Sequence, residues 1–226
     1  MKLKVGGIIK GIFPDSSVNY IRRFKKGLIN ESYDIKEFDY LLPLKKLVNE
    51  IPTYAILGNH EYGIGSGKSV MDPTYRVANI SNEAKTNLNQ LGITCLQNDL
   101  IKIIINGSSL YLFGGDEYWS GNLNFKNLAD RQENIPTIGL IHNPSFIFEQ
   151  YPPMDLFLSG HTHGGQIRVP FIGPLGRIDS ILPTKYYQGL LPLNNNEKIL
   201  ISSGIGESGA RARLFNPPEI ILLTIK

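Results

Sequence analysis

The chain has 226 residues, of which 42% are hydrophobic and 19% charged, with a formal net charge of +3. This composition supports one sizeable hydrophobic core, so we expect a single domain over residues 1–226. The lone Cys95 excludes an internal disulfide framework and fits a reducing compartment or a core thiol. No stretch approaches the roughly 20 apolar residues of a membrane-spanning helix, and no signal-peptide core is seen, so we expect a cytoplasmic protein.

Apolar periodicity predicts a mixture of helices and strands. Helices are expected at residues 18–26, 37–48 and 82–91, the last capped by Ser81 or Asn82. Strands are expected at residues 54–57, 93–96, 101–105, 110–113, 137–141, 156–158, 199–202 and 220–224. Asn106-Gly107 between two apolar runs predicts a hairpin turn. Helix-linked strands together with hairpins indicate an α/β fold with two stacked sheets flanked by helices.

All the histidines follow apolar, strand-like runs and stand beside glycine, asparagine or proline. They are His60, His142, His161 and His163. A single histidine beside a strand is more often a hydrogen-bonded loop residue, but four in three such loops favour one metal centre. His161 and His163 are two residues apart, and an extended chain would place both side chains on one face. They would then share a metal or hold two adjacent ones.

Three motifs carry a resemblance to a known family. They are Gly58-Asn59-His60-Glu61, His142-Asn143-Pro144 and the long block from Gly160 to Gln166, which reads G-H-T-H-G-G-Q. On these residues the chain resembles the calcineurin-like metallophosphoesterases, from about Phe38 to the C-terminus. The continuation at residues 167–170 and the ending at residues 213–220 resemble the branch of membrane-associated phosphodiesterases and UDP-2,3-diacylglucosamine pyrophosphatases.

The resemblance implies a four-layer α/β/β/α sandwich of two mixed sheets and a centre of two divalent transition metals, Mn, Fe or Zn. Asn59, His142 and His161 would hold one ion, and His163 would contribute to the other. His60 would act as general acid, with Glu61 orienting its ring; a solvated loop glutamate is an equally open interpretation of Glu61. These roles imply metal-dependent hydrolysis of a phosphodiester or pyrophosphate bond in a small-molecule, lipid-linked or nucleotide-sugar substrate.

The N-terminal part departs from the family pattern. Members open with Asp-x-His and Gly-Asp-x-x-Asp strand ends, which supply three ligands, including the aspartate that bridges the metals. Residues 3–11 contain neither aspartate nor histidine, and residues 27–31 lack the aspartate after glycine. We therefore expect residues 1–37 to be divergent or shortened, and the second ion to lack its carboxylates. Asp15, Asp34 and Asp39 could substitute for the missing ligands, but their polar or helical contexts are more typical of the surface. Asp116 and Glu117 are expected near the site mouth, and the resemblance implies that they contact substrate.

Two further segments bear on partners. Residues 1–46 hold ten Lys/Arg against five Asp/Glu, which indicates a solvated helix face or contact with an anionic membrane surface. No nucleic-acid signature accompanies this charge, and no nucleic-acid partner is expected. The apolar run at residues 169–175 would rest on a lipid substrate, on the inner face of a membrane, or on the protein's own rim.

Two functions follow from this sequence. The leading one is a metallophosphoesterase, with activity lowered by the missing N-terminal ligands. The alternative is a weak or inactive remnant that binds a metal or a phosphate ligand. The missing aspartates favour the remnant, whereas the retained histidines favour the enzyme.

Overall fold

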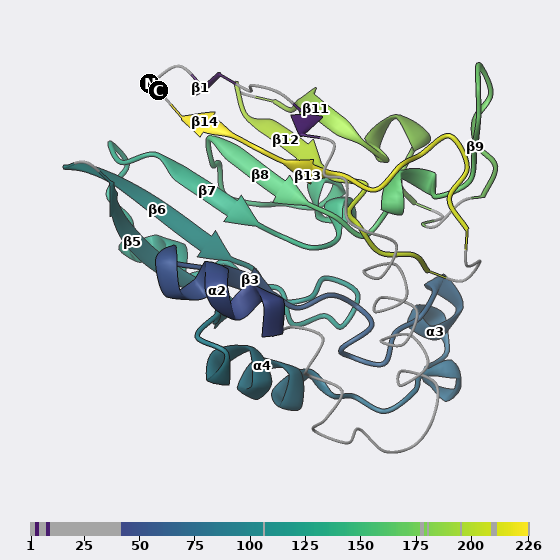
Figure 1. Cartoon of the computed structure of the whole chain (residues 1–226), viewed down its shortest axis with the longest axis horizontal. Helices are drawn as coiled ribbons and strands as arrows, with labels where there is room; N and C mark the ends of the chain where they lie inside the picture. Colours follow the sequence, from purple (N-terminus) through teal and green to yellow (C-terminus); the bar gives the residue numbers. More distant parts are fainter. Residues whose placement is uncertain are drawn as a thin grey trace.

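A six-stranded mixed sheet forms the centre of the molecule (Figure 1). The structure is a computed structural model that describes residues 3–4, 8–9, 42–105, 107–176, 179, 181–194, 196–208 and 212–225. The strand order is β11-β12-β8-β7-β6-β5, in which β12, β8, β7 and β6 run parallel and the two edge strands run antiparallel. The bounds are β5 Asp99–Ile105, β6 Ser108–Gly114, β7 Thr137–Leu140, β8 Leu156–Ser159, β11 Gly189–Pro192 and β12 Lys198–Ile201.

Shorter strand pairs form a second layer against one face of this sheet. β3 (Tyr54–Ile56) pairs in parallel with β4 (Thr94–Leu96), while β13 (Ile220–Ile221) pairs antiparallel with β2 (Ile8–Ile9) and β14 (Thr224–Ile225) with β1 (Leu3–Lys4). The two layers share one apolar cluster, since Leu96 of β4 packs with side chains of β6, β7, β8 and β12. Burial of these faces holds the two sheets together.

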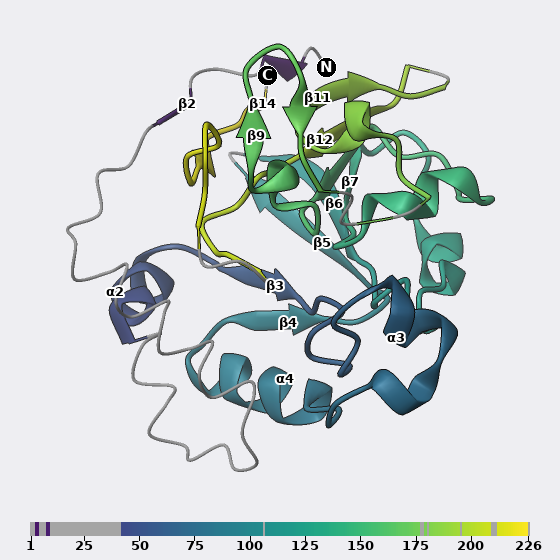
Figure 2. The same ribbon diagram turned by 90° about the vertical axis from the view of Figure 1, so that its right-hand side faces the viewer.

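Helices cover the outer sides of both layers. α2 (Leu42–Glu50) and α4 (Ser81–Gln90) lie on the side of the β3–β4 pair away from the six-stranded sheet (Figures 1 and 2). On the other face of the large sheet, the 3₁₀ turns η3 (Lys126–Asp130) and η4 (Pro144–Phe148) contribute Leu128 and Phe146 to a second buried cluster. The order of layers is therefore helix, sheet, sheet, helical turn, and the predicted α/β fold with stacked mixed sheets is confirmed.

Several local expectations need correction. The cap of α4 is neither Ser81 nor Asn82: the N-cap is Ile80, and the Asn79 side-chain oxygen accepts from the Ser81 amide at 2.9 Å instead. The strand expected at residues 220–224 is interrupted and forms the separate β13 and β14. α3 (Gly67–Met71) and the hairpin of β9 (Arg168–Val169) and β10 (Gly173–Pro174) were not expected.

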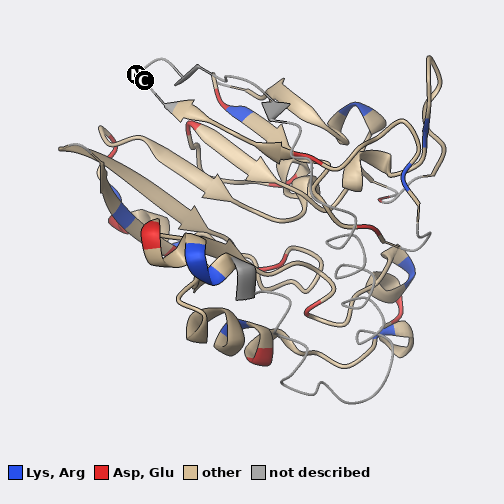
Figure 3. Cartoon of the chain, in the orientation of Figure 1, with Lys and Arg blue, Asp and Glu red and all other residues tan. Residues whose placement is uncertain are grey.

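Other expectations hold or lie beyond the described residues. The β5–β6 hairpin is confirmed, with Gly107 at a φ of 80° in its turn. The helix expected at residues 18–26, the substitutes Asp15, Asp34 and Asp39, and the shortening at residues 1–37 concern chain that the structure leaves largely undescribed. Charged residues lie mainly on helices and loops (Figure 3). Among the described residues, no helix has the length and apolar character needed to cross a membrane.

Candidate metal centre

Strand ends bring the motif residues together. β3, β7 and β8 end at Ile56, Leu140 and Ser159, and each is followed within a few residues by part of the histidine set. Because β7 and β8 are parallel neighbours, their carboxyl ends meet at one edge of the sheet. Asn59 from the β3 loop reaches the same edge, and its contacts tie the two sheets together at the candidate site.

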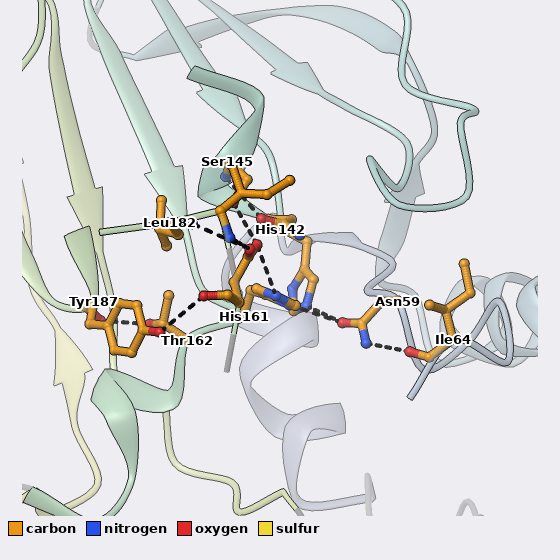
Figure 4. A network of polar contacts seen from close by, with 11 residues as sticks. Asn59, Ile64, His142, Ser145, His161, Thr162, Leu182 and Tyr187 are labelled. Carbon is orange, nitrogen blue, oxygen red and sulfur yellow. Dashed lines mark hydrogen bonds and ion pairs between the residues drawn. The ribbon is translucent and has the colours of Figure 1, made fainter. Parts of the chain in front are cut away.

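Asn59, His142 and His161 converge on one oxygen atom. The Asn59 Oδ1 lies 3.1 Å from His142 Nε2 and 3.1 Å from His161 Nδ1 (Figure 4). The Asn59 Nδ2 donates to the Ile64 carbonyl, which fixes which end of the amide faces the histidines. Asn59 and His161 are only 3% and 6% exposed. The three residues predicted to hold one metal are therefore brought together.

Glycine is required beside this cluster. A Cβ added to Gly58 would lie 2.8 Å from His142 Nε2, so only glycine lets the ring pack over the backbone there. The following turn is fixed by Asn59, whose carbonyl accepts from the Ile64 amide at 2.9 Å. The Glu61 carboxylate accepts from the Gly58 amide at 2.8 Å, and burial raises the pKa of this carboxyl. The described role of Glu61 is thus to close the turn that carries His60.

His161 is held in a strained and buried position. Its φ is 65°, a left-handed conformation that is uncommon for any residue with a side chain. The Trp119 ring packs edge-on against its ring at a centroid distance of 4.5 Å. The Asp179 carboxylate, which is 2% exposed, lies 3.9 Å from His161 Nε2. Asp179 is itself fixed, because its oxygens accept from Ser145 Oγ at 2.6 Å and from the Ile181 amide at 2.8 Å.

The rings of His142 and His161 are both kept neutral. Burial, followed by the neighbouring His163 and His60, lowers the pKa of His161 to about 3. Burial and the same neighbours, with His161 the largest charge effect, hold the pKa of His142 well below its usual range. Neutral imidazole is the form that binds metals. The electrostatics therefore favour ligation over ion pairing.

Hydrogen bonding within the cluster is incomplete in either tautomer of His161. A neutral imidazole carries one N–H. If it is on Nδ1, the buried Nε2 lone pair has no hydrogen-bond partner and faces the Asp179 carboxylate. If it is on Nε2, the Nδ1 lone pair faces the Asn59 oxygen at 3.1 Å. A cation held by Asn59, His142 and His161 resolves the conflict, because the facing lone pairs become ligands and Nε2–H points towards Asp179. The residues present fit a metal.

His60 and His163 occupy the more open side of the cluster. His60 is exposed, and its Nε2 lies 3.4 Å from Ser208 Oγ. His163 has a φ of 50°, and its Nδ1 lies 3.2 Å from the Gly206 carbonyl oxygen. Both rings are close enough to His161 to lower the pKa of its imidazole. Both of these contacts come from the loop after β12.

The structure corrects three details of the sequence interpretation. The chain at His161 and His163 is not extended, because both residues have positive φ and His163 begins the 3₁₀ turn η5 (His163–Gly165). Glu117 does not line a site mouth, since its side chain is 0% exposed. Asp116 accepts a hydrogen bond from the Tyr62 hydroxyl and so braces the turn after His60. Among the described residues, no three or more His, Cys, Asp or Glu side chains form a metal-binding group, and the converging set is two imidazoles and one amide.

Asp179 was missed by sequence reasoning. It lies in no strand-like run, and nothing in its sequence context distinguishes it from a surface aspartate. Arg213 donates from Nε to the Gly206 carbonyl beside His163, and in the sequence it is only the first residue of the C-terminal segment 213–220. Neither residue has a pattern that sequence periodicity could detect.

Comparisons with known proteins identify the family of the chain. A family model described as calcineurin-like phosphoesterase matches residues 25–165. The chain belongs to this family, whose members are phosphoric ester hydrolases dependent on divalent metals.

Individual relatives carry names of the same kind. An uncharacterized metallophosphoesterase of Aquifex aeolicus (strain VF5) is 29% identical over 201 residues, covering 85% of this chain and 68% of that protein. The phosphodiesterase YaeI of Escherichia coli (strain K12) is 32% identical over 189 residues, covering 83% and 62%. The uncharacterized metallophosphoesterase YkoQ of Bacillus subtilis (strain 168) is 28% identical, covering 80% and 63%. The chain thus spans about two thirds of the length of these relatives.

Proposed function

We propose that this chain is a metallophosphoesterase that hydrolyses a phosphodiester or pyrophosphate bond. The observation that carries the proposal is the convergence of His142 Nε2 and His161 Nδ1 on the Asn59 oxygen, 3.1 Å from each. In either tautomer of His161, a ring nitrogen lone pair faces an acceptor until a cation is bound: Nδ1 faces the Asn59 oxygen, or Nε2 faces the Asp179 carboxylate. When bound, divalent metal ions in such a site activate water and offset negative charge on phosphoryl oxygens.

The remaining residues have separate tasks in this proposal. Asn59, His142 and His161 hold one ion, and His163 contributes to another. Asp179 orients the His161 ring from behind, as carboxylates commonly do for metal-bound histidines. His60, exposed beside this cluster, donates a proton from its ring to the leaving oxygen, because imidazole titrates near neutrality. Glu61 holds the turn that aims His60 through its bond to the Gly58 amide.

An activated aryl phosphodiester tests the activity. With Mn²⁺ added, wild type should hydrolyse bis(p-nitrophenyl) phosphate faster than His161→Ala, because the variant lacks a ligand of the best-formed site. Metal-dependent turnover in wild type alone supports the proposal. Indistinguishable background rates for both proteins with Mn, Zn and Fe would instead support the second candidate, a remnant that binds metal without turnover. The scarcity of described carboxylates in the cluster favours that candidate.

For the substrate class, we favour a lipid-linked phosphoester. The β9–β10 hairpin follows the histidine loop directly and projects from the molecule (Figure 1). Its Phe171 and Ile172 are exposed, as are Leu175 and Phe215 nearby. Hairpin residues and Phe215 line a surface hollow of about 480 Å³. Exposed apolar patches of this kind mark interaction sites for lipids or proteins.

Vesicle flotation tests the lipid contact. Wild type should float with anionic phospholipid vesicles, and the double variant Phe171→Ser with Ile172→Ser should bind less. Ile104→Ser is the matched control, because Ile104 is 71% exposed on the edge strand β5, away from the hairpin. Equal flotation of all three proteins, or none by wild type, would reject this substrate class while leaving the hydrolase proposal intact.

A further inference from the structure

Arg213 gathers backbone carbonyl groups from two segments near the metal centre. Its Nε donates to the Gly206 carbonyl at 3.1 Å, and its Nη2 donates to the same oxygen and to the Ser203 carbonyl at 2.6 Å. Its Nη1 donates to the Asn216 carbonyl at 3.3 Å. Carbonyl oxygens pointing at one place repel each other, so the fixed donor fork of arginine is what holds this arrangement.

The Gly206 carbonyl also contacts His163. Its oxygen lies 3.2 Å from His163 Nδ1. Because a carbonyl only accepts, Nδ1 carries the proton and Nε2 carries the lone pair of the neutral ring. The backbone of His163 is bound to the same C-terminal segment, since Asn216 Nδ2 donates to the His163 carbonyl at 2.6 Å. The ring and the backbone of His163 therefore both contact residues whose carbonyl groups are bound by Arg213.

The same loop reaches two more residues of the site. The Ser208 amide donates to Gln166 Oε1 at 2.6 Å, and Ser208 Oγ lies 3.4 Å from His60 Nε2. A shift of residues 203–208 would therefore be transmitted to His163 and His60. It would not reach the Asn59, His142 and His161 contacts directly, because those are made between strand-end loops.

We infer that Arg213 is a positioning residue for the second metal ion, acting through the Gly206 carbonyl on the His163 ring. The inference rests on the proposed function. Arg213 touches neither metal nor substrate in this account; it fixes the tautomer and direction of a ligand whose ion lacks the usual carboxylates. Partners of this outer kind typically change metal affinity by about 10–100-fold.

Mn²⁺ titration followed by electron paramagnetic resonance tests this role without relying on turnover. Arg213→Met should retain the first, tight ion and weaken the second about 10-fold or more. Arg213→Lys should fall between Arg213→Met and wild type, because lysine supplies a cation but no planar fork. Arg131→Met is the matched control, since Arg131 also donates to a backbone carbonyl, that of Pro153 at 2.6 Å. It should titrate like wild type.

A double-variant cycle separates positioning from general stability. If Arg213 acts through His163, then Arg213→Met combined with His163→Ala should bind the second ion no more weakly than His163→Ala alone. Additive losses would overturn the inference, as would an unchanged second affinity in folded Arg213→Met. If Arg213→Met fails to fold, the same double-variant cycle can be measured with Arg213→Lys. Absence of any Mn²⁺ binding by wild type would reject the proposed function itself.

Discussion

The two sides of the metal centre are built in different ways. Asn59, His142 and His161 follow strands directly and contact each other within the sheet edge. His60 and His163 are more exposed and are contacted by Ser208 and Gly206, in the irregular loop after β12. The first side takes its rigidity from the packed sheets, whereas the described contacts of the second come from an irregular loop. We therefore expect the first side to bind its ion tightly and the second side to be the easier one to disrupt.

The largest expected effect on turnover concerns the open side. His60→Ala should lower the hydrolysis of an alkyl phosphodiester by about 10²–10⁴-fold, because general acids contribute about that much. The loss should be smaller for a p-nitrophenyl ester, whose leaving group needs little protonation. Metal content should stay near that of wild type by elemental analysis. Loss of metal in this variant would identify His60 as a ligand, and equal losses for both esters would remove its role as an acid.

The next effect concerns the buried side. Asp179→Ala should weaken the tight ion by about 10–100-fold, because the variant removes the carboxylate behind His161. Asp179→Asn should lose less, since its amide oxygen can still accept from His161 Nε2–H. Asp130→Ala, at an exposed aspartate in η3, is the control. Calorimetric titration with Zn²⁺ measures the three affinities, and an unchanged affinity in Asp179→Ala would contradict the orienting role.

A smaller loss is expected at the glycine under His142. Gly58→Ala places a Cβ 2.8 Å from His142 Nε2 and must displace the ring. We expect about a 10-fold loss in affinity for the tight ion, since overpacking commonly costs about 1–3 kcal/mol. Gly67→Ala is the matched control, because a Cβ there meets no atom within 4 Å. Identical titrations for the two variants would show that His142 adapts, and that the buried side is less rigid than described.

The smallest effect on the metal centre is expected from the buried carboxyl after β6. Burial, partly offset by the Trp119 and Ser120 amides, raises the pKa of Glu117 from 4.5 to about 7. Between these values the folded chain binds more protons than the unfolded one, so this group's stabilising contribution is full below pH 4.5 and is lost as pH rises to 7. Glu117→Gln should therefore flatten this slope and raise the free energy of unfolding at pH 8 by on the order of 2 kcal/mol.

Urea unfolding of the metal-free protein at several pH values measures this slope. Glu133→Gln, an exposed glutamate, should leave it unchanged. Metal affinity at pH 7 should be close to wild type in both variants. If Glu117→Gln lowered metal affinity as much as Asp179→Ala does, Glu117 would belong to the centre rather than to its surroundings.

Sequence reasoning found the features that repeat or alternate. Apolar runs predicted β3 to β8 and β12, and the histidines placed after them predicted one centre. The family resemblance of the motifs added Asn59 to His142 and His161, and these three residues do meet. Sequence reasoning missed the conformations and residues that irregular segments contribute to the site. The positive φ of His161 depends on tertiary packing, and Asp179 and Arg213 act from irregular segments that carry no periodic pattern. The predicted cap of α4 was wrong for a local reason, because the Asn79 side chain accepts the hydrogen bond from the Ser81 amide.

Elemental analysis of the purified and dialysed chain tests the central claim most directly. Wild type and His163→Ala should each retain about one divalent transition metal per chain, because both keep Asn59, His142 and His161. His161→Ala should retain almost none, since removing a direct ligand should cost more than the roughly 10–100-fold typical of its outer partners. Two tightly retained ions in wild type would show that other ligands complete the open side. No retained ion after metal loading, or equal retention in His161→Ala and wild type, would contradict the account.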